Sequence, residues 1–371
     1  MTIGQNGIFI KAQNATKKYE EATLNEQNTI NQIVDYIDEK FEEYGPKTVS
    51  SVKGGEKFNE TETIQDDNGK KVTIPKGFSV SEDSNTVVDE GIVITDGTNE
   101  FVWVPVDDPN TMFVEETVKL NGVDTATTIY SKLRVREDEI DDYTVGKPGN
   151  RNSIREPDVL SSYDTNSNYY KSILGFDSTK EMADSMVAEY KKMSESVKKY
   201  NGFYIGRYEL TGTVDKPTEK AGNVLVASAG EAKNWYGLYK ACQNVIQNNS
   251  DVKSTMIYGC QWDETMAWLK NTIFKGQEDK VDKDSSSWGN YNSNHEEPTG
   301  SVAKYKVNEI YDLAGNYREW TQEAGSDGYR FNRGGNSLSA DANYPASARI
   351  INYPDVTNNH YTSRATLYIT K

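Results

Sequence analysis

The chain has 371 residues, a formal net charge of -16, and a hydrophobic content of 35%. An acidic surface of this kind repels phosphate backbones, so the composition argues against nucleic acid as a partner. The length exceeds that of a single core of ordinary size and predicts one large domain with appendages. No run of about eighteen apolar residues occurs, so no segment is predicted to span a membrane.

Few residues are available for the commonest catalytic and metal-binding arrangements. The two cysteines, Cys242 and Cys260, are too few for a disulfide scaffold or a thiolate metal site, although one bridge between them stays open. The two histidines, His295 and His360, cannot form a three-histidine metal site, and no Gly-x-Ser-x-Gly motif accompanies them. No spacing pairs two carboxylates in a recognisable catalytic pattern. These features predict that the protein is not an enzyme.

Residues 6–44 are predicted to form one long helix. Apolar residues recur every three or four positions, and Gly45-Pro46 ends the pattern. The apolar stripe is narrow and the opposite face is polar. The helix therefore either packs on its own domain or acts as a stalk.

The stretch from Gly4 to Ala15 resembles the segment that follows the membrane helix of type IV pilin-like surface proteins of Gram-positive bacteria. The resemblance implies an apolar helix of about twenty residues before this point. We expect that segment to have been trimmed, with Met1 as a new start, which leaves this chain soluble. It also implies a bacterial cell-surface, extracellular location and a native form that is membrane-anchored or assembled with other pilin subunits.

Residues 46–106 are predicted to form a small β-rich region. Asp67-Asn68-Gly69 is a hairpin turn signal between the strand-like runs 62–64 and 71–74. Further strand-like runs occur at 91–94 and 101–104. The polar segment 107–175 is interpreted as an insertion without a predicted fold.

Three helices are predicted in the remainder of the chain. The first, 178–200, begins with a capping box of Ser178 and Glu181 and ends at Asn201-Gly202. The others, at 230–247 and 261–273, each carry one apolar face. A strand is predicted at 203–210 and short strands within 301–371. The sum is an α+β fold.

Five segments resemble the formylglycine-generating-enzyme family, in the family's order. The most specific is 310–320, where Leu-Ala-Gly-Asn is followed by Glu-Trp; the others are 203–209, Glu231-Ala232 with Cys242, 261–268, and 333–336 followed by 363–369. The resemblance covers about 200–371 and implies a C-type-lectin-like fold of the formylglycine-generating-enzyme type. We therefore expect a pilin-like helix (1–45), a small β region (46–106) and a C-type-lectin-like domain (107–371).

The resemblance implies a structural calcium ion. Asp312, Gly315, Tyr317 and Glu319 match family positions that supply oxygen ligands, two of them carboxylates and two of them backbone carbonyls. The alternative is a structural turn in which Glu319 satisfies backbone N–H groups and Trp320 fills the core. Arg333 is expected to pair with an acidic neighbour.

The family's enzymatic chemistry is not expected here. Its oxidase holds copper with two cysteines in the C-terminal part, but no cysteine follows Cys260 in this chain. Related iron-dependent sulfoxide synthases need three histidines. An oxidoreductase of this family is therefore the least favoured function.

Residues 325–361 are rich in Asn, Tyr, Ser, Gly and Arg, and no Lys occurs between Val307 and Thr370. Such residues dominate antibody binding loops, and Lys is depleted at binding surfaces. This ending resembles the variable proteins of diversity-generating retroelements, which carry the same lectin-like fold. The resemblance implies eight displayed, ligand-binding positions: Asp341, Asn343, Tyr344, Ile350, Ile351, Asn352, Tyr353 and Asp355. Ile350 and Ile351 are less typical of a binding surface, and an ordinary Asn-rich loop surface is the alternative.

Three hypotheses for the function follow. The first is a pilin-anchored binding protein with a diversified face, whose ligand is an unknown protein or glycan. The second is a surface adhesin of the same scaffold with one unchanging ligand. The third is a structural pilin subunit whose lectin-like domain decorates a fibre.

Overall fold

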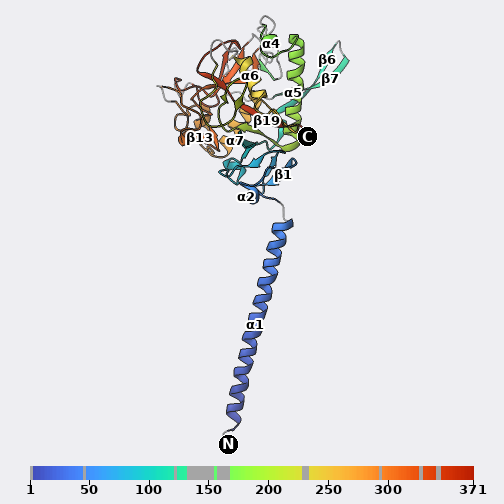
Figure 1. Ribbon diagram of the computed structural model, residues 1–371, viewed down its shortest axis with the longest axis vertical. Coiled ribbons are helices and arrows are strands. Elements are labelled where there is room, and N and C mark those ends of the chain that lie inside the picture. Colours follow the sequence, from blue (N-terminus) through green and yellow to red (C-terminus); the bar gives the residue numbers. More distant parts are fainter. Residues whose placement is uncertain are drawn as a thin grey trace. The chain divides into compact units, whose positions relative to one another are not determined.

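A computed structural model describes most of the chain: residues 3–44, 47–120, 123–131, 154–156, 168–227, 234–291, 295–325, 329–339 and 344–371. The chain divides into two compact units, Met1–Lys47 and Thr48–Lys371 (Figure 1). The predicted boundary at 45 therefore lies close to a real one. The predicted boundary at 106 does not separate compact units, because residues 48–106 belong to the second unit.

The first unit is the helix α1 (Ile3–Tyr44), which confirms the predicted helix. Its described side chains, from 11 to 36, are all exposed, including the apolar Tyr19, Ile30 and Ile33. Among the helices that the structure describes, none has both the length and the apolar character needed to cross a bilayer.

The main sheet of the second unit is antiparallel and contains strands from both ends of the chain. Its order is β12 (Val252–Met256), β19 (Ala365–Ile369), β9 (Gly202–Gly206), β5 (Glu100–Pro105), β4 (Val93–Thr95) and β3 (Ser79–Val80). The pairing of β5 with β9 explains why the predicted β region is no separate domain. A local sequence pattern carries no signal for a pairing across such a long separation.

The second sheet carries the C-terminal strands. Its order is β17 (Arg349–Asn352), β16 (Arg330–Arg333), β15 (Arg318–Gly325) and β18 (Tyr361–Ser363), and β8 (Ile154–Arg155) also pairs with β15. The β15–β18 pair is parallel, whereas the other pairs are antiparallel.

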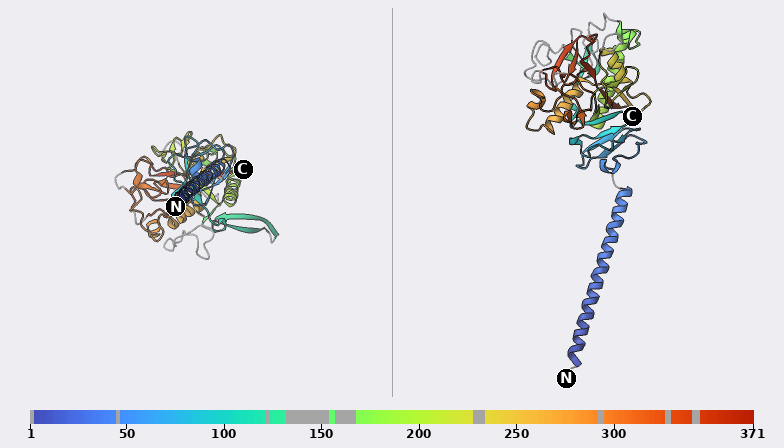
Figure 2. Two further views of the ribbon diagram at one scale, coloured as in Figure 1. Left: turned by 90° about the horizontal axis from the view of Figure 1, so that it is seen from below. Right: turned by 60° about the vertical axis from the view of Figure 1, so that its left-hand side comes forward.

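The other strands that the structure describes form four two-stranded hairpins: β1 (Glu62–Gln65) with β2 (Lys71–Ile74), β6 (Phe113–Leu120) with β7 (Val123–Ser131), β10 (Thr211–Gly212) with β11 (Pro217–Thr218), and β13 (Lys306–Val307) with β14 (Ile310–Tyr311). The first confirms the predicted turn at Asp67-Asn68-Gly69. The β6–β7 hairpin lies in the segment without a predicted fold and extends away from the sheets (Figure 2).

The helices of the second unit are α2 (Val49–Val52), α4 (Tyr169–Ser172), α5 (Thr179–Tyr200), α6 (Trp235–Gln243), α7 (Gly259–Asn271) and α8 (Asp279–Asp282), with 3-10 turns at η1 (Val88–Glu90), η2 (Pro109–Thr111) and η4 (Ala303–Tyr305). The second unit is thus α+β, as predicted. The predicted helix 261–273 ends earlier than expected, and Ile273 lies beyond it with a half-exposed side chain. Residues 230–233 of the predicted helix 230–247 lie outside the described part, and α6 ends at Gln243.

Helix α5 shows how local sequence defines an element. The Ser178 hydroxyl accepts a hydrogen bond from the Glu181 N–H at 3.1 Å, and Asn201 ends the helix in the left-handed region with φ 54°. The predicted apolar face is buried: Met182, Met186, Tyr190, Met193 and Val197. This helix packs on β9 and β19.

The core is built around large aromatic side chains. Trp103 of β5 meets Tyr204 of β9 edge to face, with ring centroids 5.0 Å apart. A Cβ at Gly202 would lie 2.2 Å from the Trp103 ring, so only glycine fits opposite this indole. Trp235, Trp262 and Trp320 are also fully buried.

Candidate functional site

The Leu-Ala-Gly-Asn motif forms a buried, tightly wound turn. Asp312, Gly315 and Asn316 all have positive φ, which glycine and short polar residues tolerate best. A Cβ at Gly315 would lie 2.2 Å from the Asn290 carbonyl oxygen. The Asn316 side chain donates to Glu209 at 2.5 Å and accepts from the Glu297 N–H at 3.0 Å. The motif therefore joins three separate segments of the chain.

The Glu319 carboxylate, which follows this turn, is held by a buried arginine. Arg364 donates two hydrogen bonds to it, at 3.0 and 2.7 Å, and both side chains are almost completely buried. The Trp320 side chain is buried in the core. The partner of Glu319 is thus a guanidinium and not the backbone N–H groups of the alternative hypothesis.

The predicted calcium ligands do not fit a cation site in these contacts. Both Glu319 oxygens already bind Arg364, while Asp312 accepts hydrogen bonds from Thr299 at 2.9 Å and from the Gly300 N–H at 3.3 Å. Calcium needs six or more oxygen ligands, and a guanidinium bound to one of them repels the ion. Among the residues that the structure describes, no group of three or more His, Cys, Asp or Glu is arranged to hold a metal. No role is therefore derived through calcium.

A second buried charge network supports β16 and β17. Arg333 binds Asp263 at 2.6 Å and Glu323 at 3.3 Å, which confirms its predicted acidic partner. Arg349 binds the same two carboxylates, at 2.8 and 2.6 Å. Two guanidinium groups and two carboxylates therefore balance each other beneath these strands.

The outer end of β16 and β17 carries a pair of tyrosines. Arg333 lies opposite Arg349 and Phe331 opposite Ile351, and the same register places Tyr329 opposite Tyr353. Because side chains alternate along a strand, these three pairs share one face of the sheet. The tyrosine rings stack with centroids 4.6 Å apart, and their hydroxyls are hydrogen-bonded at 3.0 Å.

Burial decreases along this face. The side chains of Arg333 and Arg349 are each 1% exposed, Phe331 is buried, Ile351 is half-buried, and Tyr353 is 42% exposed. The rigid end therefore lies inside the protein and the aromatic end faces solvent. We call the aromatic end, made by Tyr329, Ile351 and Tyr353, the tyrosine face.

The two isoleucines among the predicted binding residues lie on opposite faces of β17. Ile351 lies on the tyrosine face, whereas Ile350 and Asn352 point to the other face of β17. The Asn352 amide donates to the Tyr361 hydroxyl at 2.7 Å. Both isoleucines are half-buried, so neither is a core residue.

The remaining predicted positions lie on flanking turns. Tyr344 is half-buried, and the Arg318 guanidinium lies 4.8 Å from its ring centroid. Asp355 is half-buried in a turn that α6 holds, because the Trp235 N–H donates to the Pro354 carbonyl at 3.0 Å. Asp341 and Asn343 lie outside the described residues.

Sequence reasoning missed several residues of this site. Arg318 lies 4.8 Å from the Tyr344 ring centroid and 5.9 Å from that of Tyr361, and no pattern in the sequence indicates these contacts. Tyr329 was part of the Tyr-rich composition, but its pairing with Tyr353 depends on strand register. The spacing of the tyrosines around one hairpin was the available signal.

Both cysteines are free thiols buried in the core, so the disulfide left open by the sequence is not formed. Cys242 lies 3.7 Å from the Ser363 hydroxyl. Burial raises the pKa of both thiols well above their ordinary value, which keeps them protonated and weakly nucleophilic.

Comparison with known proteins yields distant likenesses only. No protein-family model matches the chain, and no curated protein does. Among solved structures, CarF is 12% identical, with a TM-score of 0.31 over 46% of this chain and 87% of that one. Treponema denticola variable protein 1 is also 12% identical, with a TM-score of 0.28 over 74% of this chain and 97% of that one. At these TM-scores, neither structure assigns a fold or a function to this chain.

Several buried carboxyl groups predict how stability depends on pH. Burial raises the pKa of Glu156 and Glu189, and it raises that of Glu323 to about 7 against the opposing effect of Arg349 and Arg333. A raised pKa means that the folded state binds the proton more tightly than the unfolded chain does. This contribution is complete below the unfolded value near 4.5 and is lost as the pH rises through the folded value.

We therefore expect the free energy of unfolding, measured with urea, to fall as the pH rises from about 5 to about 8. The Glu323→Gln variant should show a shallower fall over the same range, whatever its absolute stability. A free energy of unfolding that rises across this range would contradict the assignment.

The contacts of Glu319 and Asp312 predict the response to calcium. A ligand raises thermal stability only when it binds the folded state, so millimolar calcium and excess chelator should leave the melting temperature unchanged. An increase with calcium that Asp312→Asn abolishes would instead support the predicted calcium site.

Proposed function

We propose that this chain is a non-catalytic ligand-binding protein and that the tyrosine face is its binding surface. The observation that carries the proposal is the stacked Tyr329–Tyr353 pair at the solvent end of a face whose other end is a buried charge network. Tyrosine supplies a large contact area at low entropic cost, and a rigid support reduces the cost of binding further.

The surroundings of the tyrosine face suit recognition of a macromolecule. Arg318 and Tyr344 form a further cation–aromatic pair, which lies towards the Arg333 end of β16 because Glu319, next to Arg318, is opposite Arg333. Aromatic residues and arginine are the commonest hot spots of protein interfaces. The ligand class we propose is a protein or a glycan of another cell or molecule.

The finer proposal is a variable protein of a diversity-generating retroelement, displayed outside a bacterial cell on a pilin-like anchor. Its support is the sequence resemblance of 325–361 together with the position of Tyr344, Ile351, Tyr353 and Asp355 on partly or fully exposed surface. Exposed positions on a rigid scaffold accept many side chains, which diversification requires.

A structural pilin subunit is the second candidate. The observation that favours it is the exposed apolar stripe of α1, with Tyr19, Ile30 and Ile33. Such a stripe suits packing against the same helix of other subunits.

Sequencing the DNA downstream of the gene tests the diversification directly. We expect a near-copy of the 3′ end that differs mainly at adenines, beside a reverse transcriptase gene. The altered codons should encode the exposed positions of the tyrosine face and its flanking turns. Without such a repeat, diversification is wrong and an adhesin with one unchanging ligand, or a pilin subunit, takes its place.

Tolerance to substitution tests the same surface without knowledge of the ligand. We expect Ile351→Ser, Tyr353→Ser and Asp355→Ser each to change the free energy of unfolding by no more than about 1 kcal/mol, because these side chains are partly or fully exposed. Arg349→Ala is the matched buried control on the same strand. It should cost about 3–5 kcal/mol, since it leaves Asp263 and Glu323 without one cation.

Urea denaturation of the four variants gives the comparison. If the three partly or fully exposed positions lose as much free energy of unfolding as Arg349→Ala does, the surface is structural and the proposed binding face is wrong.

A further inference from the structure

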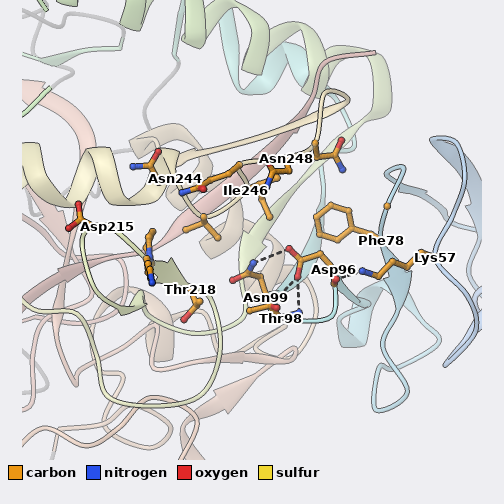
Figure 3. A pocket seen from close by; sticks show the side chains of 16 residues that line it. Lys57, Phe78, Asp96, Thr98, Asn99, Asp215, Thr218, Asn244, Ile246 and Asn248 are labelled. Carbon is orange, nitrogen blue, oxygen red and sulfur yellow. Dashed lines mark hydrogen bonds between the residues drawn. The ribbon is translucent and has the colours of Figure 1, made fainter. Parts of the chain in front are cut away.

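A hollow lies elsewhere in the second unit and shares no residue with the tyrosine face. Its volume is about 700 Å³, within the range of roughly 300–1,000 Å³ typical of ligand sites. Three segments line it (Figure 3): the turn between β4 and β5, the β10–β11 hairpin, and the loop 244–249 after α6. Lys57 and Phe78 complete the lining from the N-terminal side.

The walls of this hollow are held in place by their own hydrogen bonds. Asp96 accepts from the N–H groups of Thr98 and Asn99, each at 2.8 Å, and the Asn99 side chain accepts from the Glu219 N–H at 2.9 Å. On the opposite wall, Asn249 donates to the Lys76 carbonyl at 2.7 Å and accepts from the Asp251 N–H at 2.9 Å. The cavity is therefore formed before any ligand arrives.

Three other side-chain amides on these walls form no hydrogen bond with described residues of the protein. Within the described part of the chain, the side chains of Asn244, Gln247 and Asn248 make no hydrogen bond, and Gln247 and Asn248 are exposed. Asn244 and Asn248 lie along one side of the hollow, and Thr218 and Asn99 lie along the other (Figure 3). Each side-chain amide offers two donors and one acceptor oxygen. A ligand here must therefore both donate and accept hydrogen bonds.

The charges of the lining cancel. Asp96 and Asp215 are matched by Lys57 and Lys216, so the hollow favours neither an anion nor a cation. The apolar side chains of Phe78, Val245 and Ile246 also line the hollow, and each is buried. A matching ligand is neutral, carries many hydroxyl groups, and has an apolar face of C–H groups.

We propose that this hollow binds a neutral oligosaccharide. Sugar hydroxyls donate to and accept from these amides, and the C–H groups of the sugar rings lie against the apolar part of the lining. The site is independent of the tyrosine face, so the molecule has two binding surfaces of different chemistry. A flexible polar peptide offers the same hydrogen bonds. It loses more conformational entropy on binding, however, and has no sugar ring whose C–H groups could lie against the apolar residues.

The test uses the full chain on an array of neutral and charged glycans, followed by titration calorimetry with the neutral oligosaccharide that binds best. The double variant Gln247→Leu/Asn248→Leu should weaken its binding at least about tenfold, because the lost hydrogen bonds leave sugar hydroxyls unpaired. The matched control is Asn271→Leu/Gln277→Leu, which removes one Asn and one Gln that do not line the hollow. The control should bind like the unmodified chain.

Tyr353→Ser distinguishes the two surfaces. It should leave the oligosaccharide affinity unchanged even if the proposed function of the tyrosine face is correct. Loss of binding in Tyr353→Ser but not in the Gln247/Asn248 variant would place the glycan on the tyrosine face and overturn the inference. Binding of charged glycans only, of no glycan, or of polar peptides instead would overturn it as well.

Discussion

The buried guanidinium of Arg364 is the contact on which the arrangement of the second unit depends. Arg364 stands between β18, which belongs to the second sheet, and β19, which belongs to the main sheet. It binds Glu319 of β15 and donates to the carbonyls of Gly206 and Tyr311 at 2.9 and 2.8 Å. One side chain thus joins both sheets at the point where the chain crosses between them, and a buried ion pair with so many partners tolerates few alternative arrangements.

The strands that carry the tyrosine face are connected to Arg364 through β15. β15 is held by Arg364 through Glu319 and pairs with β16, and β16 pairs with the edge strand β17. The charges of Arg333 and Arg349 are balanced inside the protein, so the outward Tyr329–Tyr353 pair has no part in neutralising them. This separation lets the surface residues vary without unpairing a buried charge, which is the property that a diversified binding face needs.

Local patterns in the sequence predicted the helices α1 and α5 and the β1–β2 hairpin, because capping, periodicity and turn residues act over a few positions. They could not predict that β5 pairs with β9, or that Arg364 binds Glu319 from 45 residues away along the chain. Alternation along β17 was readable in the sequence once the strand was known, and it would have separated Ile350 from Ile351. The calcium ligands were predicted from the motif at 310–320 alone, and the motif gives no sign that Arg364 binds Glu319.

Arg364 also changes the balance of charge around the predicted calcium ligands. Glu209, Glu219, Asp312 and Glu319 are buried near Arg364, four carboxyl groups around one cation. Burial and the neighbouring carboxylates raise the pKa of Glu209, and burial raises the pKa of Glu219, in both cases well above the ordinary value. Protons held on Glu209 and Glu219 therefore remove part of the excess negative charge. The carboxyl groups of the motif and its neighbours thus lie, together with Arg364, in a partly protonated hydrogen-bonded network inside the fold.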